Sequence, residues 1–292
     1  MNNAITQSKP KFSVVIQSDA YKNLINNTLG DKSKATRFIA SISSAVATNP
    51  ALQECTPQSV ISGALVGEAL GLSPSPQLGQ YYLVGYKNKN TGNTEAVFTM
   101  GYKGYISMLI KSGLYKDLDA FEIHEGEFKG RDKETGKFKF EFIEDENERL
   151  SRPVIGYMAY FTMQNNFTKS VYMSKEEMLN HADTYSKAFN KADYEKLQAG
   201  QIPEKDMWKY SSFWYKNFDS QGLKTVLRRL ISKWGILSTE IQNAYEKDMA
   251  VIKEDGTFEY VDNPNDEVIE ANVTETNATA PTSLDDIKWI TK

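Results

Sequence analysis

The sequence predicts an α+β protein in which antiparallel β-hairpins form a sheet that is backed by helices. Short strand-like segments flank turns rich in Asn and Gly at 80–100 and 154–173, which is typical of hairpins. Other segments carry apolar residues at three- and four-residue steps, the period of a helix with one buried face. The predicted organisation is a helical N-terminal segment at 1–50, a core at 51–245 and an acidic, mostly disordered tail at 246–292.

The composition fits a folded protein that is neither secreted nor inserted in a membrane. Of the 292 residues, 40% are hydrophobic, which is enough for a sizeable core. No apolar run approaches the roughly eighteen residues of a membrane span, and the first residues, MNNAITQSKPKFSVVIQ, are too polar for a secretory signal. We therefore expect a soluble, cytoplasmic protein without a membrane partner.

The sequence offers few residues for metal or disulfide chemistry. Cys55 is the only cysteine, so an internal disulfide is excluded and a reducing cytosol is expected. His124 and His181 are the only histidines, which argues against a zinc site built from His and Cys. The prediction therefore includes no metal and no cofactor, and it leaves magnesium dependence open.

Two helices are predicted in the N-terminal segment. The first begins at Asp19 and is closed by Gly30, and the second runs from about Lys32 to Thr48 and stops at Asn49-Pro50. Their apolar stripes are narrow. They fit packing on the core of the same chain as well as packing on a neighbouring subunit.

A helix and a hairpin are predicted next along the chain. Thr56-Pro57 opens the helix, because Thr is a good N-cap and proline suits the first helical position, and the helix ends at Gly71. Gly63 and Gly67 within it would be tolerated where another backbone comes close. Residues 80–86 and 95–100 are then predicted as the two strands of a hairpin.

The motif Gly101-Tyr102-Lys103-Gly104 follows the hairpin and leads into a helix that ends at Ser112-Gly113. It lacks the four-residue gap and the Gly-Lys-Ser/Thr ending of a nucleotide-binding phosphate loop. The glycines would let a sugar-phosphate chain approach the backbone closely, with Lys103 as the charge and a tyrosine as a stacking surface. A glycine-bounded turn with a surface lysine is the alternative interpretation.

The middle of the chain predicts more strands. Residues 118–125 are expected to pair with 138–143 across a charged turn, and 154–163 with 167–173. Ser174-Lys175-Glu176-Glu177 is a capping box that starts a helix. The polar stretch at 184–206 is expected to be mobile or partly helical, and able to cover a groove.

The segment from Phe213 to Gln242 carries the strongest functional signal. Within it, 222–234 is predicted as a helix whose apolar stripe belongs in a core. No acidic residue falls between Gln221 and Thr239 to neutralise the cations of this helix, so a basic ridge is expected. The stripe is Leu223, Val226, Leu227, Leu230, Ile231 and Trp234, and the cations are Lys224, Arg228, Arg229 and Lys233.

Aromatic residues lie just upstream of this helix, beside Lys209 and Lys216. Rings next to cations form the combination that stacks bases and follows phosphates. The alternative is that the rings belong to the core and that the cations form a solvated helix face. The aromatic residues are Trp208, Tyr210, Phe213, Trp214, Tyr215 and Phe218.

The charge is distributed unevenly, so the net value of −4 does not exclude a nucleic-acid partner. Residues 246–292 hold twelve acidic residues and four lysines, a charge of −8, which leaves 30 basic and 26 acidic residues in 1–245. Seven basic and two acidic residues lie between Lys205 and Lys233. The local field decides whether a phosphate backbone is attracted.

These motifs resemble the RecT family of phage single-strand annealing proteins. The resemblance rests on Trp214 and Phe218, on Lys224-Thr225-Val226-Leu227-Arg228-Arg229-Leu230, and on Ser238-Thr239-Glu240-Ile241-Gln242. Further similar segments lie between Leu65 and Tyr86, at Gly101–Gly104 and at Lys111–Gly113, so that it covers about Leu52 to Gln242. The chain departs from the family pattern at Gln221-Gly222 and at Ser232-Lys233-Trp234-Gly235, which concerns the packing and the end of the helix.

The resemblance implies an ATP-independent protein that binds and anneals single-stranded DNA in homologous recombination, without a covalent catalytic step. It also implies a phage-encoded homo-oligomer or filament, assembled through the N-terminal segment and working in the cytoplasm of a bacterial host. The implied partners are single-stranded DNA, the annealed duplex, a phage exonuclease and the host single-strand-binding protein. The candidate DNA-binding residues, expected to line a groove, are Lys224, Arg228, Arg229, Lys103, Tyr102, Arg149, Arg152, Gln80 and Tyr82.

Two other functions fit parts of the sequence. Glu127-Phe128-Lys129, with Asp117 or Asp119 upstream, has the outline of a metal-dependent nuclease site. Such a nuclease would shorten labelled single strands in magnesium, whereas an annealing protein leaves them intact. A structural assembly protein, whose basic ridge meets an acidic protein or the chain's own tail, would lose assembly when 248–292 are deleted.

Overall fold

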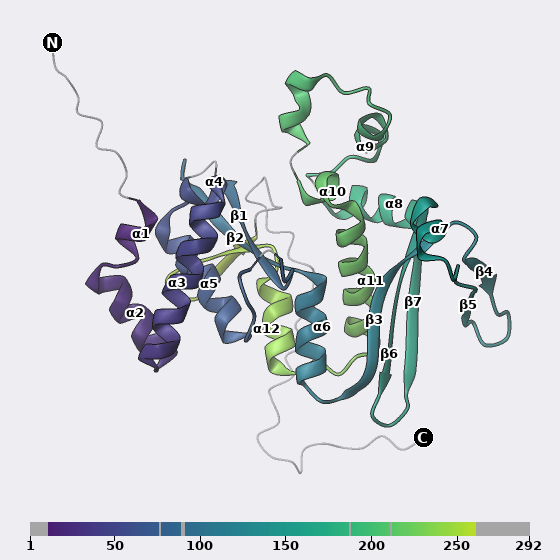
Figure 1. Ribbon diagram of the computed structural model, residues 1–292, viewed down its shortest axis with the longest axis horizontal. Helices are drawn as coiled ribbons and strands as arrows, with labels where there is room; N and C mark the ends of the chain where they lie inside the picture. Colours follow the sequence, from purple (N-terminus) through teal and green to yellow (C-terminus); the bar gives the residue numbers. More distant parts are fainter. Residues whose placement is uncertain (1–10, 76, 89–90, 187, 211, 261–292) are drawn as a thin grey trace, which may run out of the picture. The chain divides into compact units, whose positions relative to one another are not determined.

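The computed structural model describes residues 11–75, 77–88, 91–186, 188–210 and 212–260, which form a mixed α+β fold (Figure 1). The predicted class of antiparallel sheets with helices is confirmed. One four-stranded antiparallel sheet has the order β1 (Tyr81–Lys87), β2 (Thr94–Met100), β8 (Ala250–Ile252) and β9 (Phe258–Tyr260). No helix within the described ranges is long and apolar enough to cross a membrane.

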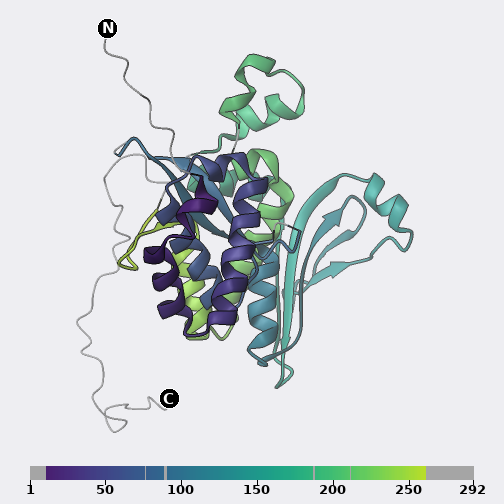
Figure 2. The same cartoon turned by 60° about the vertical axis from the view of Figure 1, so that its left-hand side comes forward.

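The N-terminal helices pack on the core of their own chain. They are α1 (Phe12–Val15), α2 (Asp19–Leu29) and α3 (Lys32–Thr48), and Figure 2 shows them in purple, close together. Gly30 ends α2 with a positive φ of 65°, a conformation that glycine adopts at little cost. Ile25, Phe38 and Ile42 are buried in the main core.

The first sheet begins with the predicted hairpin, in which Tyr81 pairs with Met100 and Lys87 with Thr94. Helix α5 (Pro57–Ala69), preceded by the short α4 (Pro50–Gln53), packs against this sheet. A Cβ on Gly67 would lie 2.4 Å from the Tyr81 ring. This glycine therefore makes room for a side chain, and not for another backbone as the sequence suggested.

Two strands lie within the stretch predicted as an acidic, mostly disordered tail from residue 246. Strands β8 and β9 extend the first sheet beyond β2, and Ala250, Val251 and Ile252 are all buried. The unit that contains the core runs to Asp262. The three apolar residues are a short run among acidic neighbours, so composition alone concealed them. The rest of the predicted tail lies outside the described residues.

The second sheet has the order β3 (Tyr115–His124), β6 (Val154–Met163) and β7 (Thr168–Ser174), and β6 and β7 are the predicted hairpin. The expected pairing of 118–125 with 138–143 is wrong, because β3 pairs with β6. Instead β5 (Phe138–Phe140) forms a local hairpin with β4 (Phe128–Arg131). The Phe128 and Phe140 rings lie 5.6 Å apart there, and a short turn needs less loop closure than a distant partner.

Helix α11 (Phe218–Trp234) packs against the second sheet and against α6 (Tyr102–Lys111). Its predicted stripe is buried from Leu223 to Ile231, whereas Trp234 is 41% exposed. Gly222 lies against the Tyr157 ring, 2.8 Å from where a Cβ would stand, which explains a small residue at this departure from the family pattern. Helix α12 (Thr239–Lys247) follows and contacts α6, β2 and β8.

The segment between β7 and α11 is largely helical. Helix α8 (Lys175–Tyr185) starts with the predicted capping box, in which Ser174 and Glu177 cap each other's backbone. The stretch expected to be mobile or partly helical contains helical pieces. These are α9 (Lys191–Gln198) and the start of the 3-10 helix η1 (Glu204–Lys209). Helix α10 (Phe213–Lys216) follows beyond that stretch.

Candidate nucleic-acid interface

Two of the cations predicted to bind phosphates are held by one buried carboxylate. The Asp248 side chain has no exposed surface; Lys224 Nζ lies 2.8 Å and Arg228 Nη1 2.9 Å from its oxygens. The backbone amide of Met100 donates to the same carboxylate at 2.9 Å, and the Tyr105 hydroxyl at 3.3 Å. Burial, followed by the charge of Asp248, raises the pKa of Tyr105 well above its usual value, so its hydroxyl stays a donor. We call this the Asp248 cluster.

The Asp248 cluster contradicts the expectation that the cations of α11 have no acidic neighbour. Lys224 is only 4% exposed and its ammonium group is paired with Asp248, although the residue also lines the smaller of two neighbouring pockets described below. The side chain of Arg228 keeps 26% of its surface exposed, and its guanidinium stacks on the Tyr245 ring at 3.9 Å. Arg228 can therefore hold the carboxylate and still contribute charge at the surface.

A pocket of about 450 Å³ lies between α8, α11 and α12. A smaller pocket beside it shares four of its residues and adds six others, among them Lys224, Trp214 and Met249. We call the larger one the α8–α11 pocket. It is lined by His181, Tyr185, Thr225, Arg228, Arg229, Ser232 and Tyr245.

The side chains of this pocket suit a nucleic-acid strand. Arg229 is exposed and its nearest polar contact is Met173 Sδ at 3.4 Å, a weak acceptor, with no carboxylate partner among the described residues. Tyr185 is 73% exposed, and its ring lies 4.7 Å from that of His181. Burial, then the charges of Arg229 and Arg228, lowers the pKa of His181. Guanidinium groups beside an open aromatic ring can contact phosphates and stack a base.

The glycines of the Gly101–Gly104 motif serve the protein's own packing. A Cβ on Gly101 would lie 2.0 Å from the Gly79 carbonyl oxygen, and one on Gly104 2.1 Å from that of Gln80. The glycines were predicted to let a sugar-phosphate chain come close to the backbone. It is the loop before β1 that lies against them. The side chain of Gln80 also accepts a hydrogen bond from the Ser73 amide at 2.8 Å.

The predicted residues around this motif do lie near one another. Lys103 is exposed; its Nζ is 6.0 Å from the centre of the Tyr102 ring, and its stem passes Gly79. The Tyr82 ring lies 5.9 Å from that of Phe213 in α10, and the next residue, Trp214, lines the smaller pocket. We call Gln80, Tyr82, Tyr102 and Lys103 the glycine-turn cluster. Helix α10 thus contacts the glycine-turn cluster through Phe213 and lines the smaller pocket through Trp214.

The upstream aromatic residues divide between core and surface. Tyr215 and Phe218 are buried with Phe189 and Tyr194, so the core interpretation is correct for them. Trp208 is 73% exposed, with Lys209 Nζ 5.8 Å from its ring centre.

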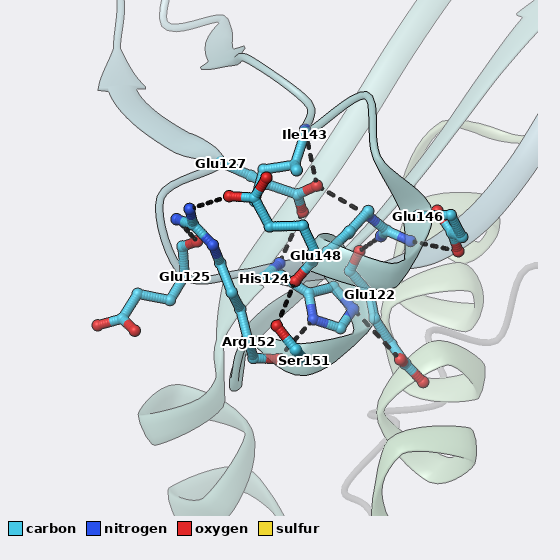
Figure 3. A network of polar contacts seen from close by, with 10 residues as sticks. Glu122, His124, Glu125, Glu127, Ile143, Glu146, Glu148, Ser151 and Arg152 are labelled. Carbon is cyan, nitrogen blue, oxygen red and sulfur yellow. Dashed lines mark hydrogen bonds and ion pairs between the residues drawn. The ribbon is translucent and has the colours of Figure 1, made fainter.

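Arg149 and Arg152 are held in a separate network at the end of the second sheet. Figure 3 shows this network, with Arg152, Glu127 and Glu148 labelled. Arg149 Nε lies 2.7 Å from the fully buried Glu127 carboxylate, and its Nη2 donates to the Glu122 carbonyl oxygen. Arg152 pairs with Glu148 on α7 (Glu146–Ser151) at 2.5 Å and donates to the Glu125 carbonyl oxygen. Both arginines fix the chain between β3 and β6.

The outline of a nuclease site at Glu127 is not assembled. Burial opposes ionisation of Glu127, but hydrogen bonds from the His124 amide and Arg149 outweigh it, so the pKa of this carboxyl is lowered. Its two oxygens are thus committed to protein donors. In the described part of the chain, no group of three or more His, Cys, Asp or Glu side chains could hold a metal ion.

A sequence model of the RecT family matches residues 36–264. The chain belongs to the RecT family. It is 37% identical to the uncharacterized protein YqaK of Bacillus subtilis strain 168 over 233 residues, which are 80% of this chain and 69% of that protein. It is 27% identical to the protein RecT of Escherichia coli strain K12 over 222 residues, 73% of this chain and 71% of that protein.

Membership of the RecT family supports a protein of DNA recombination that binds and anneals single-stranded DNA, and not a classical enzyme. The family match extends past residue 245 to 264, in agreement with the place of β8 and β9 in the sheet.

Sequence reasoning missed three residues of this RecT-family site. His181 and Tyr185 lie one turn apart on α8, directly after the capping box, and that spacing was a usable signal for a shared face. Asp248 gave no local signal, because it stands in an acidic stretch, 24 residues after Lys224. Only the fold brings the two together.

Proposed function

We propose that this chain binds single-stranded DNA without ATP and anneals it to a complementary strand along a groove shared by an oligomer. The chemistry is binding alone. The proposal includes a phage origin and the partners that the resemblance implies, a phage exonuclease and the single-strand-binding protein of the bacterial host. The proposed DNA binding rests on one observation: Arg228, Arg229 and the exposed Tyr185 ring line the same α8–α11 pocket.

In this proposal the strand contacts two groups of residues. Arg229 and Arg228 bind phosphates in the α8–α11 pocket, and Tyr185 stacks a base. Lys103 and the tyrosines of the glycine-turn cluster form the second contact, with α10 between the two. Lys224 takes a positioning role, because it anchors the carboxylate that orients Arg228.

Annealing follows from contacts that leave the base edges free. Guanidinium, ammonium and aromatic groups grip phosphates and ring faces, so the hydrogen-bonding edges can meet a second strand. The annealed product adds a second phosphate chain, which strengthens the electrostatic contact. Repeated subunits along the strand supply avidity that one pocket lacks.

The test compares Arg229→Ala with Lys233→Ala, because both remove one exposed cation from α11. Lys233 lies over the Trp234 ring, 5.5 Å from its centre, and does not line the α8–α11 pocket. We expect Arg229→Ala to weaken binding of a labelled oligonucleotide about tenfold and to lower the slope of log affinity against log salt by about one. Annealing of complementary oligonucleotides should slow in parallel.

Lys233→Ala should keep affinity within about twofold, which is the control for a general loss of charge. Equal losses in the two variants would show that the pocket has no special role. Unchanged binding by Arg229→Ala, with the fold verified by circular dichroism, would refute the proposed contact.

A further inference from the structure

A second basic pocket lies at the N-terminal helices, outside all the residues assigned so far except Gln80. It has a volume of about 390 Å³ and lies between α3 and the chain that follows α5. We call it the α3 pocket. It is lined by Lys34, Arg37, Phe38, Ser41, Glu68 and 71–74, together with Gln80.

The two cations of the α3 pocket are not used by the fold. Lys34 and Arg37 are exposed, and neither side chain has a hydrogen bond or an ion pair to another described residue. Lys111 adds a third positive charge at the rim, where its Nζ donates to the Gly71 carbonyl oxygen at 2.6 Å. Glu68 is the one acidic residue among those that line the pocket, and the charge of Asp31 at the start of α3 also acts on Lys34 and Arg37. With Lys111, three cations still outnumber these two carboxylates.

Gln80 joins this pocket to the glycine-turn cluster. Its Oε1 is occupied by the Ser73 amide, which leaves its amide group to donate. Its backbone carbonyl accepts from the Gly101 amide at 2.9 Å, one residue before Tyr102 and two before Lys103. Gln80 therefore lines the α3 pocket and is also bonded through its backbone to the motif that carries Lys103.

We propose that the α3 pocket binds phosphates of the same DNA strand that contacts the glycine-turn cluster. This rests on the proposed function and deepens it, because it adds a DNA contact to a helix for which only packing on the core or on a neighbouring subunit was expected. Arg37 offers a planar fork that matches a phosphate, and Lys34 a mobile ammonium group. Glu68 weakens the pocket for a lone anion, so the ligand is a polyanion that also holds the neighbouring cluster.

An acidic segment of a second copy of the chain is the competing occupant. The strand is favoured because Gln80 lines the pocket and Lys103 lies beside the preceding residue, Gly79, and because a phosphate chain repeats its charge along its length. An acidic protein segment would require no such continuation.

The experiment compares two double variants of the full chain. Lys34→Ala with Arg37→Ala removes two charges from the pocket, and Lys22→Ala with Lys32→Ala removes two charges from α2 and α3 that do not line it. Affinity for a labelled oligonucleotide is measured over a series of salt concentrations. We expect the pocket variant to lose about tenfold or more in affinity and about two in the salt slope, and the control to stay within about twofold.

A conservative variant separates charge from geometry. Arg37→Lys should keep the salt slope, because the charge remains, and lose a fewfold in affinity, because the fork is gone. Thermal unfolding checks that every variant is folded, and sedimentation reports its assembly.

The inference is overturned if the pocket variant binds like the control while the unsubstituted protein binds single-stranded DNA. It is equally overturned if the pocket variant changes assembly alone, which would favour the acidic protein segment. Failure of the unsubstituted protein to bind single-stranded DNA would instead overturn the proposed function itself.

Discussion

Helix α11 carries two pairs of cations that differ in burial and in their carboxylate partners. Lys224 and Arg228 meet the buried carboxylate of Asp248 and are partly or fully withdrawn from solvent. Arg229 and Lys233 are exposed and have no carboxylate partner among the described residues. One residue step, from 228 to 229, separates an arginine that is paired with a buried carboxylate from one that has no carboxylate partner among the described residues.

The comparison teaches that a basic sequence motif mixes structural and binding residues. A buried charge needs a partner, and removal of that partner costs several kcal/mol, whereas an exposed charge costs little to remove. The same division occurs at the second sheet, where Arg149 meets a buried carboxylate and Arg152 an exposed one. Measured stability and measured affinity should therefore respond to different cations.

The largest effect is expected from Asp248→Ala. It leaves Lys224, which is 4% exposed, without its counter-charge, and it frees the Met100 amide. We expect the free energy of unfolding, measured in urea, to fall by about 3–5 kcal/mol. Glu246→Ala, at an exposed position on α12, is the matched control and should change it by less than about 0.5 kcal/mol. A small change in the free energy of unfolding of Asp248→Ala would mean that the paired cations of α11 do not stabilise the fold more than the exposed ones.

Arg149→Ala should come next. Its side chain is 17% exposed, and its guanidinium binds the fully buried Glu127 together with the Glu122 carbonyl oxygen. We expect a loss of about 2–4 kcal/mol in the free energy of unfolding. The affinity of the folded variant for single-stranded DNA should be unchanged, and a specific loss of affinity with normal stability would return Arg149 to the binding surface.

The pH dependence of DNA affinity tests the exposed cation Arg229 and its neighbour His181. Burial and the charges of Arg229 and Arg228 lower the pKa of His181, so the ring is neutral at pH 7 in the free protein. A bound phosphate would offset the arginines and raise that pKa, and a proton would be taken up on binding. Affinity should therefore increase as the pH falls through the range in which the ring of the bound protein becomes protonated, by about tenfold for each pH unit by which binding raises the pKa.

His181→Gln should flatten this pH profile. Lys233→Ala, whose side chain lies outside the pocket, should keep it. A profile that stays the same in His181→Gln would place the strand away from α8.

The smallest effect is expected from Arg152→Ala. Both this side chain, at 39%, and its partner Glu148, at 53%, are substantially exposed. We expect the free energy of unfolding to fall by no more than about 1 kcal/mol, measured beside Arg149→Ala in the same urea series. A loss as large as that of Arg149→Ala would mean that burial of the carboxylate partner does not determine how much each arginine contributes to stability.

Local features of the fold could be predicted from the sequence, and long-range ones could not. The hairpins of β1 with β2 and of β6 with β7, and the capping box at Ser174, are set by neighbouring residues. The pairing of β3 with β6 and the place of β8 beside β2 depend on segments far apart in the chain. The same limit applies to the candidate site, because no residue near Lys224 in the sequence indicates that it pairs with Asp248.

The place of β8 in the first sheet bears on how the protein should be shortened for laboratory work. A cut at residue 245, where the composition turns acidic, would remove the strand that covers the edge of β2 and the carboxylate that neutralises two cations. An open, apolar strand edge recruits other chains, so such a fragment should precipitate on expression. A cut after residue 260 would spare both features.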